Sequence, residues 1–447
     1  MYAIDLQRLA ALRTERWSGV GRNVYFLGAT SLLTDLSSEM VAAVLPFYLA
    51  FALRLTPIQL GLVDGLYQGT AAVTRLLGGW VADRWRRDRE VAAAGYALSA
   101  ASRLGLLAAG SAWPGIAGAV ALDRLGKGIR TTPRDALISL SCAPERRGLA
   151  FGVHRAFDTA GALAGPLLAF ALLALLPGAY DVVFVASFCL AVVGLALLLL
   201  FVRNRRRPAD AQAGAADLRG GSLRADAPAT RPGPFAAGTG AADAARAAAT
   251  PPRLAELAAL LREPRLRALT FAGAALALVT VADSFFYLTL QRRAALEAHL
   301  FPLLYAGTAL AYLLLAVPAG RLADRLGRGA VFLLGHGLLL AACLALLFAP
   351  PGTFGALLPL ALLGAYYACT DGVLMALASG LVPERLRATG LAVLATAIGL
   401  ARLLASLGFG VAWDRWGLEP ALGGFALALT VVLALTARTW LRTEARA

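Results

Sequence analysis

The chain has 447 residues, of which 59% are hydrophobic and only 15% are charged, and its formal net charge is +15. Soluble domains average about 25% charged residues, so the composition excludes an ordinary soluble protein and indicates an integral membrane protein. A basic chain can also bind nucleic acid, but here the arginines are scattered over separate short turns, and we expect no nucleic-acid partner.

Residues 1–21 mix charged residues with leucines, which favours a cytoplasmic N-terminal segment at the membrane surface and differs from the uncharged apolar stretch of a signal peptide. Beyond them, stretches of about 20 apolar residues predict six membrane-spanning helices in a first bundle, residues 22–202. These six spans are 22–51, 58–81, 91–112, 115–136, 149–174 and 182–202.

Residues 203–265 interrupt the pattern, because they are rich in alanine, glycine and proline and hold few large apolar residues. Such a composition cannot bury a core, so we expect a largely disordered cytoplasmic linker. A second bundle of six spans, residues 266–441, and a cytoplasmic tail at 442–447 complete an all-α membrane protein with twelve transmembrane helices. The six spans are 266–290, 300–320, 330–349, 355–381, 389–412 and 421–441.

The basic residues of the turns lie mostly on one side of this topology. Cytoplasmic loops of membrane proteins carry an excess of lysine and arginine, and the even-numbered turns and both tails hold most of these residues. The opposite turns hold only Arg54, Arg292, Arg293 and Arg415. We therefore predict a multi-pass protein of the inner, cytoplasmic membrane with both termini in the cytoplasm.

One short motif occurs twice, each time between two long apolar spans. The run Gly79-Trp80-Val81-Ala82-Asp83-Arg84 returns as Gly320-Arg321-Leu322-Ala323-Asp324-Arg325. We interpret the chain as two copies of one membrane unit. Many secondary transporters are built from such repeats, with the substrate site at the interface between them.

The four cysteines stand alone in or beside apolar spans, and the three histidines are dispersed. Neither group has the close spacing of a metal or redox site. We predict no bound metal and no other cofactor. We also predict no enzymatic activity, because no nucleophile, base and orienting group stand in a recognisable arrangement.

Ionisable residues inside the predicted spans are the most informative positions. Each one costs roughly 2.5–3.5 kcal/mol at the centre of a membrane helix, so most must pair with each other or line a wet cavity. Structural ion pairs are the alternative interpretation for any single residue. The acids are Asp35, Glu39, Asp123, Asp158, Asp283 and Asp371, and the bases are Arg103, Arg124, Lys127, Arg155 and Arg402.

Two of these acids, Asp35 and Glu39, are four residues apart and therefore lie on one face of the first helix. Two close carboxylates disfavour double ionisation, which makes this pair the main candidate for proton exchange. In the fifth span, His154 and Asp158 share a face in the same way, and Arg155 is close enough in sequence to pair with Asp158.

A stripe of charge follows the fourth helix, where Asp123, Lys127, Arg130 and Arg134 recur at helical spacing and run toward the cytoplasmic end. Lys127 is the only lysine of the chain. Because arginine is the default cation here, a lone lysine at mid-membrane suggests that a compact or deprotonatable ammonium group is needed. Chance substitution is the alternative.

With these residues in place, the chain resembles the major facilitator superfamily over nearly its whole length. The Gly-x-x-x-Asp-Arg-x-Gly-Arg turn of that superfamily is matched in full in the second half, whereas Arg86 replaces its second glycine in the first half. The resemblance implies that both turns brace a cytoplasmic gate, in which a carboxylate caps a helix N-terminus. The predicted gate residues are Gly79, Asp83, Arg84, Arg130, Arg134, Gly320, Asp324 and Arg325.

Two further motifs refine the resemblance. Gly152, Gly161, Gly165 and Pro166 are similar to the fifth-helix motif of proton-coupled antiporters in this superfamily. The run from Arg124 to Gly128 is similar to its Arg-x-x-Gln-Gly pattern, with lysine in place of glutamine. The longer signatures 123–137 and 34–40 resemble a large bacterial branch whose substrates are mostly unassigned.

Our first hypothesis from the sequence is a proton-coupled exporter, an antiporter of a small organic molecule that works by alternating access. Its proton-coupling candidates are Asp35, Glu39 and Asp158. We expect a monomer in the lipid bilayer whose partners are the small-molecule substrate and protons. The predicted cavity residues are Asp123, Arg124, Lys127, Arg155, Asp283, Phe286, Tyr287, Tyr366, Tyr367, Asp371 and Arg402.

Two alternatives remain open at this stage. The same fold can take up an anionic metabolite with protons, attracted by the basic stripe of the fourth helix. A protein of another class, a membrane sensor or scaffold that does not transport, can use the linker to recruit a partner. The number of charges inside the membrane argues against a scaffold, which would not need them.

Overall fold

A computed structural model describes most of the chain, and all of its described regular elements are helices. The described residues are 21–85, 87–143, 146–204, 263–348, 352–382 and 387–444, without the side chains of 71–73, 75–85, 353–354, 387–389 and 440–444. The predicted N-terminal segment and linker lie almost entirely outside these ranges. Of the predicted tail, residues 442–444 belong to the last described helix and residues 445–447 lie outside.

The first half of the chain forms six long helices, the first of which ends in a π-helical turn, η1. They are α2 (Arg22–Phe47) with η1 (Tyr48–Ala52), α3 (Pro57–Trp85), α4 (Asp88–Ala109), α5 (Trp113–Leu140), α6 (Arg147–Leu175) and α7 (Tyr180–Phe201). The second half repeats this pattern with one helix broken. Its elements are α11 (Pro264–Leu278), α12 (Asp283–Ala294), η3 (Ala298–Leu300), α13 (Phe301–Leu326), α14 (Arg328–Phe348), α15 (Thr353–Leu381), α16 (Arg387–Trp416) and α17 (Leu418–Glu444).

These elements confirm the all-α membrane fold predicted from hydropathy. Within the described ranges, ten helices or joined helix pairs are long and apolar enough to cross a membrane. The helix α5 is not among them, because the charged stripe lowers its hydropathy. Its 28 residues nevertheless span about 42 Å at the rise of an α-helix, which exceeds the hydrocarbon core of about 30 Å.

The seventh span differs from the continuous helix predicted at 266–290. The helix α11 ends at Leu278, and α12 begins at Asp283. The Thr280 hydroxyl donates to the Leu276 carbonyl oxygen, which satisfies part of the interrupted backbone. Asp283 stands in the first turn of α12, where a negative charge is favoured by the helix dipole. Discontinuous helices of this kind often build substrate sites in transporters.

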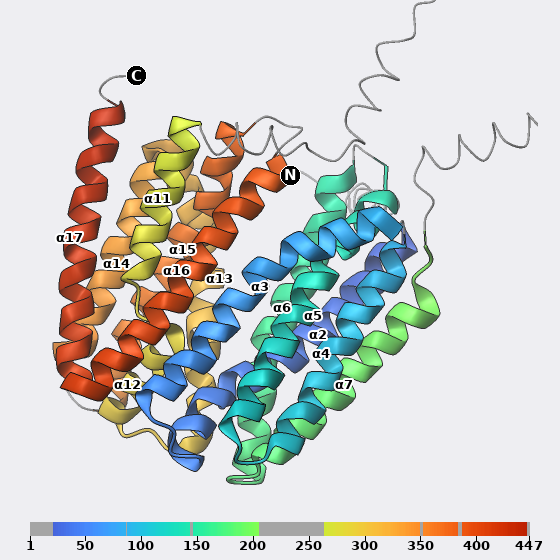
Figure 1. Cartoon of the computed structure of the whole chain (residues 1–447), viewed down its shortest axis with the longest axis horizontal. Coiled ribbons are helices and arrows are strands. Elements are labelled where there is room, and N and C mark those ends of the chain that lie inside the picture. The colour runs from blue at the N-terminus through green and yellow to red at the C-terminus, as the bar shows by residue number, and fades with distance from the viewer. Residues whose placement is uncertain are drawn as a thin grey trace, which may run out of the picture.

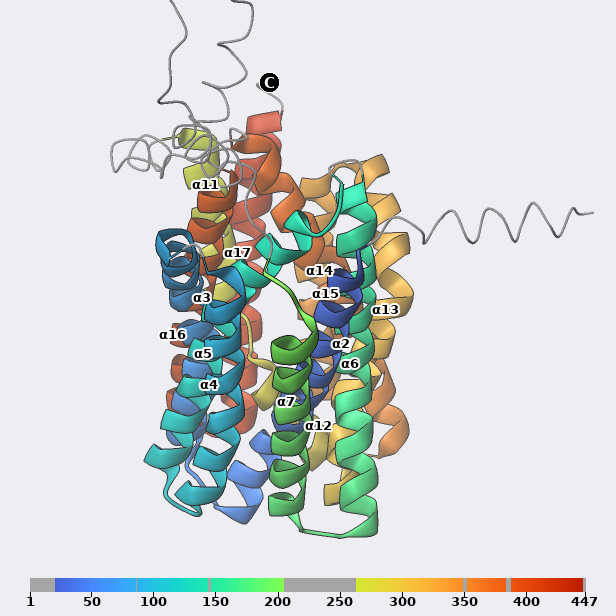
Figure 2. The same ribbon diagram turned by 90° about the vertical axis from the view of Figure 1, so that its right-hand side faces the viewer.

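The two halves lie side by side (Figure 1), and all described connections alternate between two ends of the molecule. We call the end at which α2 begins and α17 finishes the upper end, and the opposite end the lower end. Figure 2 looks onto the first half, with α3, α4 and α5 on one side and α2, α6 and α7 on the other. Within this half α4 packs along α5, and α2 packs along α6.

Glycines set the closest helix crossings. A Cβ atom at Gly61 would lie 2.6 Å from the carbonyl oxygen of Ser406, and one at Gly410 would lie 2.4 Å from that of Pro57. The first part of α3 therefore packs backbone to backbone on the last part of α16, which joins the two halves at the lower end. We call this contact the glycine seam.

The antiporter-like motif of α6 also acts through close packing. A Cβ atom at Gly161 would lie 2.5 Å from the carbonyl oxygen of Leu32, and Gly165 packs on the next turn of α2. These contacts place α6 against the helix face that carries the two predicted proton-exchange carboxylates. Gly152 behaves differently, because nothing lies within 4 Å of the Cβ position there.

Candidate functional site: a charged cavity between the two halves

Three adjoining cavities lie between the halves. The first, of about 500 Å³, is bounded by α3 and α5 on one side and by α11, α12 and α14–α16 on the other. The second, of about 450 Å³, is bounded by α2, α5 and α6 and by α12, α13 and α15. Both are lined by Lys127, Asp283, Tyr367 and Asp371, so they form one space, which we call the central cavity.

The central cavity extends toward the upper end of the molecule. On α14, which starts at the upper end, its wall includes Phe332 and His336, only a turn or two inside the helix. Toward the lower end the halves touch along the glycine seam, and the rings of Phe47 and Phe301 lie 5.3 Å apart. A smaller cavity of about 150 Å³ lies between the central cavity and this closed end.

An ion cluster at the core of the first half holds part of the charged stripe of α5. Asp123 accepts a hydrogen bond from Nε of Arg124 at 2.9 Å and forms an ion pair with Arg103 at 3.0 Å. Arg103 is 2% exposed and also donates to Ser38 and Ser187. Asp123 does not line any of the three cavities described here, so the structure places this predicted cavity residue behind the wall.

Arg124 and Lys127 stand on the cavity wall itself. The guanidinium of Arg124 lies 4.0 Å from the centre of the Tyr67 ring, and its remaining face lines the first cavity. Lys127 lines both parts of the central cavity. Among the described residues its amino group has no hydrogen-bond or ion-pair partner, which leaves one uncompensated cation in the middle of the site.

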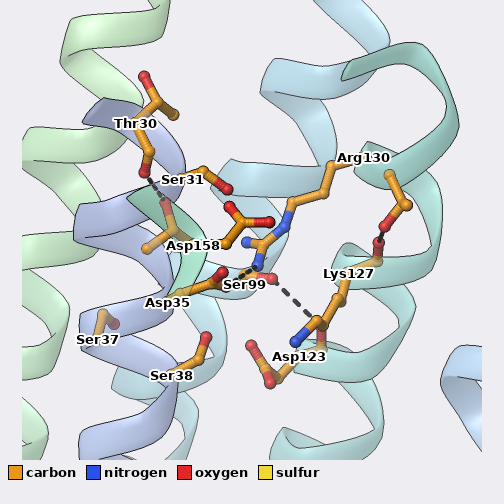
Figure 3. A network of polar contacts seen from close by, with 12 residues as sticks. Thr30, Ser31, Asp35, Ser37, Ser38, Ser99, Asp123, Lys127, Arg130 and Asp158 are labelled. Carbon is orange, nitrogen blue, oxygen red and sulfur yellow. Dashed lines mark hydrogen bonds and ion pairs between the residues drawn. The ribbon is translucent and has the colours of Figure 1, made fainter. Parts of the chain in front are cut away.

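The two predicted proton-exchange carboxylates of α2 both line the second cavity. Asp35 faces Arg130 across 3.8 Å, while the Arg130 guanidinium also lies 4.5 Å from the centre of the Tyr96 ring. Figure 3 shows Asp35 from α2 and Asp158 from α6 on the same side of this guanidinium. Glu39 lines the smaller cavity as well, so its carboxylate stands between the central cavity and the closed lower end.

The upper part of the second cavity is also charged. Asp158 contacts Nε2 of His154 at 3.5 Å, and in the described part of the chain we find no ion pair between Asp158 and Arg155. Arg155 is exposed and lines the cavity. Arg134 pairs with Asp135 at 3.0 Å. Asp158 and Arg134 therefore already have partners within the protein, whereas Arg155 is open to the cavity.

On the opposite wall, the second half contributes acids and aromatic rings. Asp283 accepts a hydrogen bond of 2.5 Å from the Tyr367 hydroxyl. Asp371 is exposed to the cavity, and Arg402 lines it close by. Tyr287 lines the second cavity, whereas Phe286 is 1% exposed and lies in the apolar core, so only the tyrosine is on the wall.

The residues predicted to form a gate stand at the upper ends of the helices. Gly320, Asp324 and Arg325 are exposed on α13, and Gly327 takes a φ of +91°, a conformation that favours glycine, in the turn to α14. The first copy of the motif, with Gly79, Asp83 and Arg84, is helical in α3. Its side chains lie outside the described part of the structure.

Sequence reasoning missed Asp64, although this carboxylate lies within the predicted span 58–81 and the rule used for the other acids applies to it. Asp64 on α3 accepts hydrogen bonds from Ser284 on α12 at 2.5 Å and from Ser406 on α16 at 2.9 Å. One carboxylate therefore bridges the two halves beside the glycine seam. We call Asp64, Ser284 and Ser406 the lower latch.

Comparisons with known proteins agree with this architecture. The model of the Major Facilitator Superfamily matches residues 27–406 and 295–446. An uncharacterized MFS-type transporter of Methanocaldococcus jannaschii is 36% identical over 193 residues, which cover 43% of this chain and 47% of that protein. An uncharacterized protein of Mycobacterium tuberculosis is 33% identical over 207 residues, or 46% and 49% of the two chains. The chain thus matches about half the length of these curated relatives.

Solved structures of similar fold include two transporters. A POT family transporter in complex with 5-aminolevulinic acid superposes with a TM-score of 0.69 at 14% identity, covering 94% of this chain and 96% of that chain. The nucleoside transporter NupG superposes with a TM-score of 0.66 at 14% identity, covering 94% and 99%. At this level of identity the likeness concerns the fold.

Proposed function

This chain belongs to the Major Facilitator Superfamily, and from that premise we propose that it is a proton-coupled exporter, an antiporter of a small organic molecule. The family makes it a multi-pass membrane transport protein rather than an enzyme. The direction, the coupling ion and the site residues are our proposal, and so are the division into two six-helix bundles and the monomeric state.

The asymmetry of the two ends supports alternating access. The central cavity extends toward the upper end, while the glycine seam and the lower latch close the lower end. Transport requires the halves to rock so that the latch breaks and the predicted gate turns, now exposed, come together. The unequal distribution of arginine supports a cytoplasmic upper end, and with that orientation this conformation faces inward.

The observation that carries the coupling proposal is the pair of α2 carboxylates, Asp35 and Glu39, on the wall of the central cavity. Asp35 already pairs with Arg130, and Glu39 borders both the central and the smaller cavity. An ionised Glu39 can hold a cationic group of the cargo, whereas a protonated Glu39 cannot. Proton and cargo then exclude each other at this carboxylate, which is the requirement for antiport.

The test is transport driven by a pH gradient in proteoliposomes, with Asp35→Asn and Glu39→Gln measured at equal reconstituted amounts. We expect each substitution to abolish gradient-driven flux while cargo binding persists. A matched control is Glu419→Gln, since Glu419 pairs with Arg293 at the lower end, away from the cavity. Full gradient-driven activity in both α2 variants would remove these carboxylates from the mechanism.

The structure gives less support to proton-linked uptake of an anionic metabolite. That alternative depends on a free basic stripe along α5, but Arg130 and Arg134 are paired with Asp35 and Asp135. The opposite wall adds two further acids, which repel an anion. Radiolabel counterflow with carboxylate and phosphate compounds that carry no cationic group separates the alternatives, because only the uptake hypothesis predicts their exchange.

A further inference from the structure

The two walls of the central cavity carry different charges. The α5 wall, which belongs to the first half, presents two cations, Arg124 and Lys127. The facing wall of the second half presents the carboxylates of Asp283 and Asp371 together with Arg402. Two cations of the first half therefore face two carboxylates and one guanidinium of the second half across the space in which cargo binds.

The protein itself satisfies only some of these groups. Arg124 is paired with Asp123, and Asp283 accepts a hydrogen bond from the Tyr367 hydroxyl. Lys127 and Asp371 have no ion pair or hydrogen bond with any other described residue, including each other. Lys127 is half-buried, and such a charge is costly without a partner, so a ligand that brings an anion to Lys127 relieves that cost. The exposed carboxylate of Asp371 is open to the cavity and can pair with a cation of the same ligand.

From this arrangement we propose that the cargo is amphoteric: an organic compound with a carboxylate or similar anionic group near Lys127, a protonated amine near Asp371 and an aromatic or apolar body between them. The proposal rests on the transport function argued above. A purely anionic compound meets the repulsion of Asp371 and Asp283. A purely cationic one meets that of Lys127 and Arg124.

The rest of the wall fits the body of such a compound. Tyr67, Phe332, Tyr366 and Tyr367 line the first cavity, so rings are available for stacking on both sides of it. Its volume of about 500 Å³ falls within the usual range of small-molecule pockets, about 300–1,000 Å³. Charged groups at the two walls, with aromatic rings between them, would fix the orientation of a bound compound as well as contribute to its affinity.

The test uses matched trios of compounds and the thermal stability of the purified full chain. Each trio has a parent with a free amine and a free carboxylate, its N-acetyl acid and its carboxamide. Tryptophan, phenylalanylphenylalanine and 4-(aminomethyl)benzoic acid serve as parents, because they separate the two charges by different lengths. Ligands that bind the folded state raise Tm, and we expect at least one parent to raise it more than either blocked form.

Two cavity variants test whether Lys127 and Asp371 recognise the ligand or only stabilise the fold, because each should lose binding of a different charged group. Lys127→Gln should weaken binding of the parent about tenfold to a hundredfold but leave binding of the carboxamide unchanged. Asp371→Asn should weaken binding of the parent by a similar factor but leave binding of the N-acetyl acid unchanged. The controls Arg267→Gln and Asp414→Asn remove exposed charges outside the cavities and should leave both the ligand-free Tm and the affinities unchanged.

The proposal is overturned if a blocked form stabilises the chain as well as its parent, if no member of any trio raises Tm, or if both cavity variants lose all three members alike. Failure of the export function gives a different result. A parent that raises Tm but moves no protons in proteoliposomes refutes antiport and leaves the cargo class intact.

Discussion

Removing one hydroxyl of the lower latch should open the lower end. With the lower end closed, Asp64 accepts hydrogen bonds from both Ser284 and Ser406, which belong to the other half. A hydrogen bond to a charged group contributes about 1.5–3 kcal/mol. Loss of one such bond by Ser406→Ala therefore shifts the equilibrium toward a state open at the lower end by about tenfold to a hundredfold.

The assay is thiol labelling of a cysteine placed at Leu60, which lines the small cavity beside the latch and is 6% exposed. The native cysteines are first replaced, and a membrane-impermeant reagent is added from the lower side. We expect labelling about tenfold faster in Ser284→Ala and in Ser406→Ala. The control Ser379→Ala removes a hydroxyl that donates to the Ala376 carbonyl oxygen of the same helix, α15. Labelling at the parental rate in both latch variants would refute the latch.

Two further predictions concern packing and the buried ion cluster. Gly410→Ala places a methyl group 2.4 Å from a carbonyl oxygen of α3 and should also speed thiol labelling of Leu60→Cys from the lower side. The control Gly423→Ala, where nothing lies within 4 Å of the added methyl group, should leave the labelling rate unchanged. Equal labelling rates in the two variants would exclude the glycine seam as a gate contact. Asp123→Asn leaves Arg103 buried without its carboxylate, and we expect a loss of about 3–5 kcal/mol, seen as a clear fall in Tm. An unchanged Tm would contradict the structural role of the cluster.

Hydropathy alone predicted nearly all helix positions, because a span must be long and apolar whatever its neighbours are. It did not predict the break between α11 and α12, since Val279 and Val281 continue the apolar pattern there. The first residue of α12, Asp283, was recognised as an acid inside the membrane. That it starts a second helix depends on contacts with other helices, among them the hydrogen bond from Tyr367.

The same limit applies to the site. Sequence spacing placed Asp35, Lys127 and Arg130 on faces that meet in the structure, because helical periodicity fixes which residues share a face. Pairings between helices, such as Arg103 with Asp123 or Asp64 with Ser406, depend on which helices are neighbours. Spacing along one chain carries no information on that, so the buried ion cluster and the lower latch emerged only from the fold.

Proton countertransport is the central claim, and the lumenal pH of sealed proteoliposomes tests it most directly. An amphoteric parent compound that raises Tm is added outside vesicles with an acidic lumen and an internal pH dye, with empty vesicles as the control. Antiport moves protons out as the compound enters, in either orientation of the protein, so the lumen should become more alkaline. A lumen that turns more acidic, or a pH that does not change while the compound accumulates, would contradict the account.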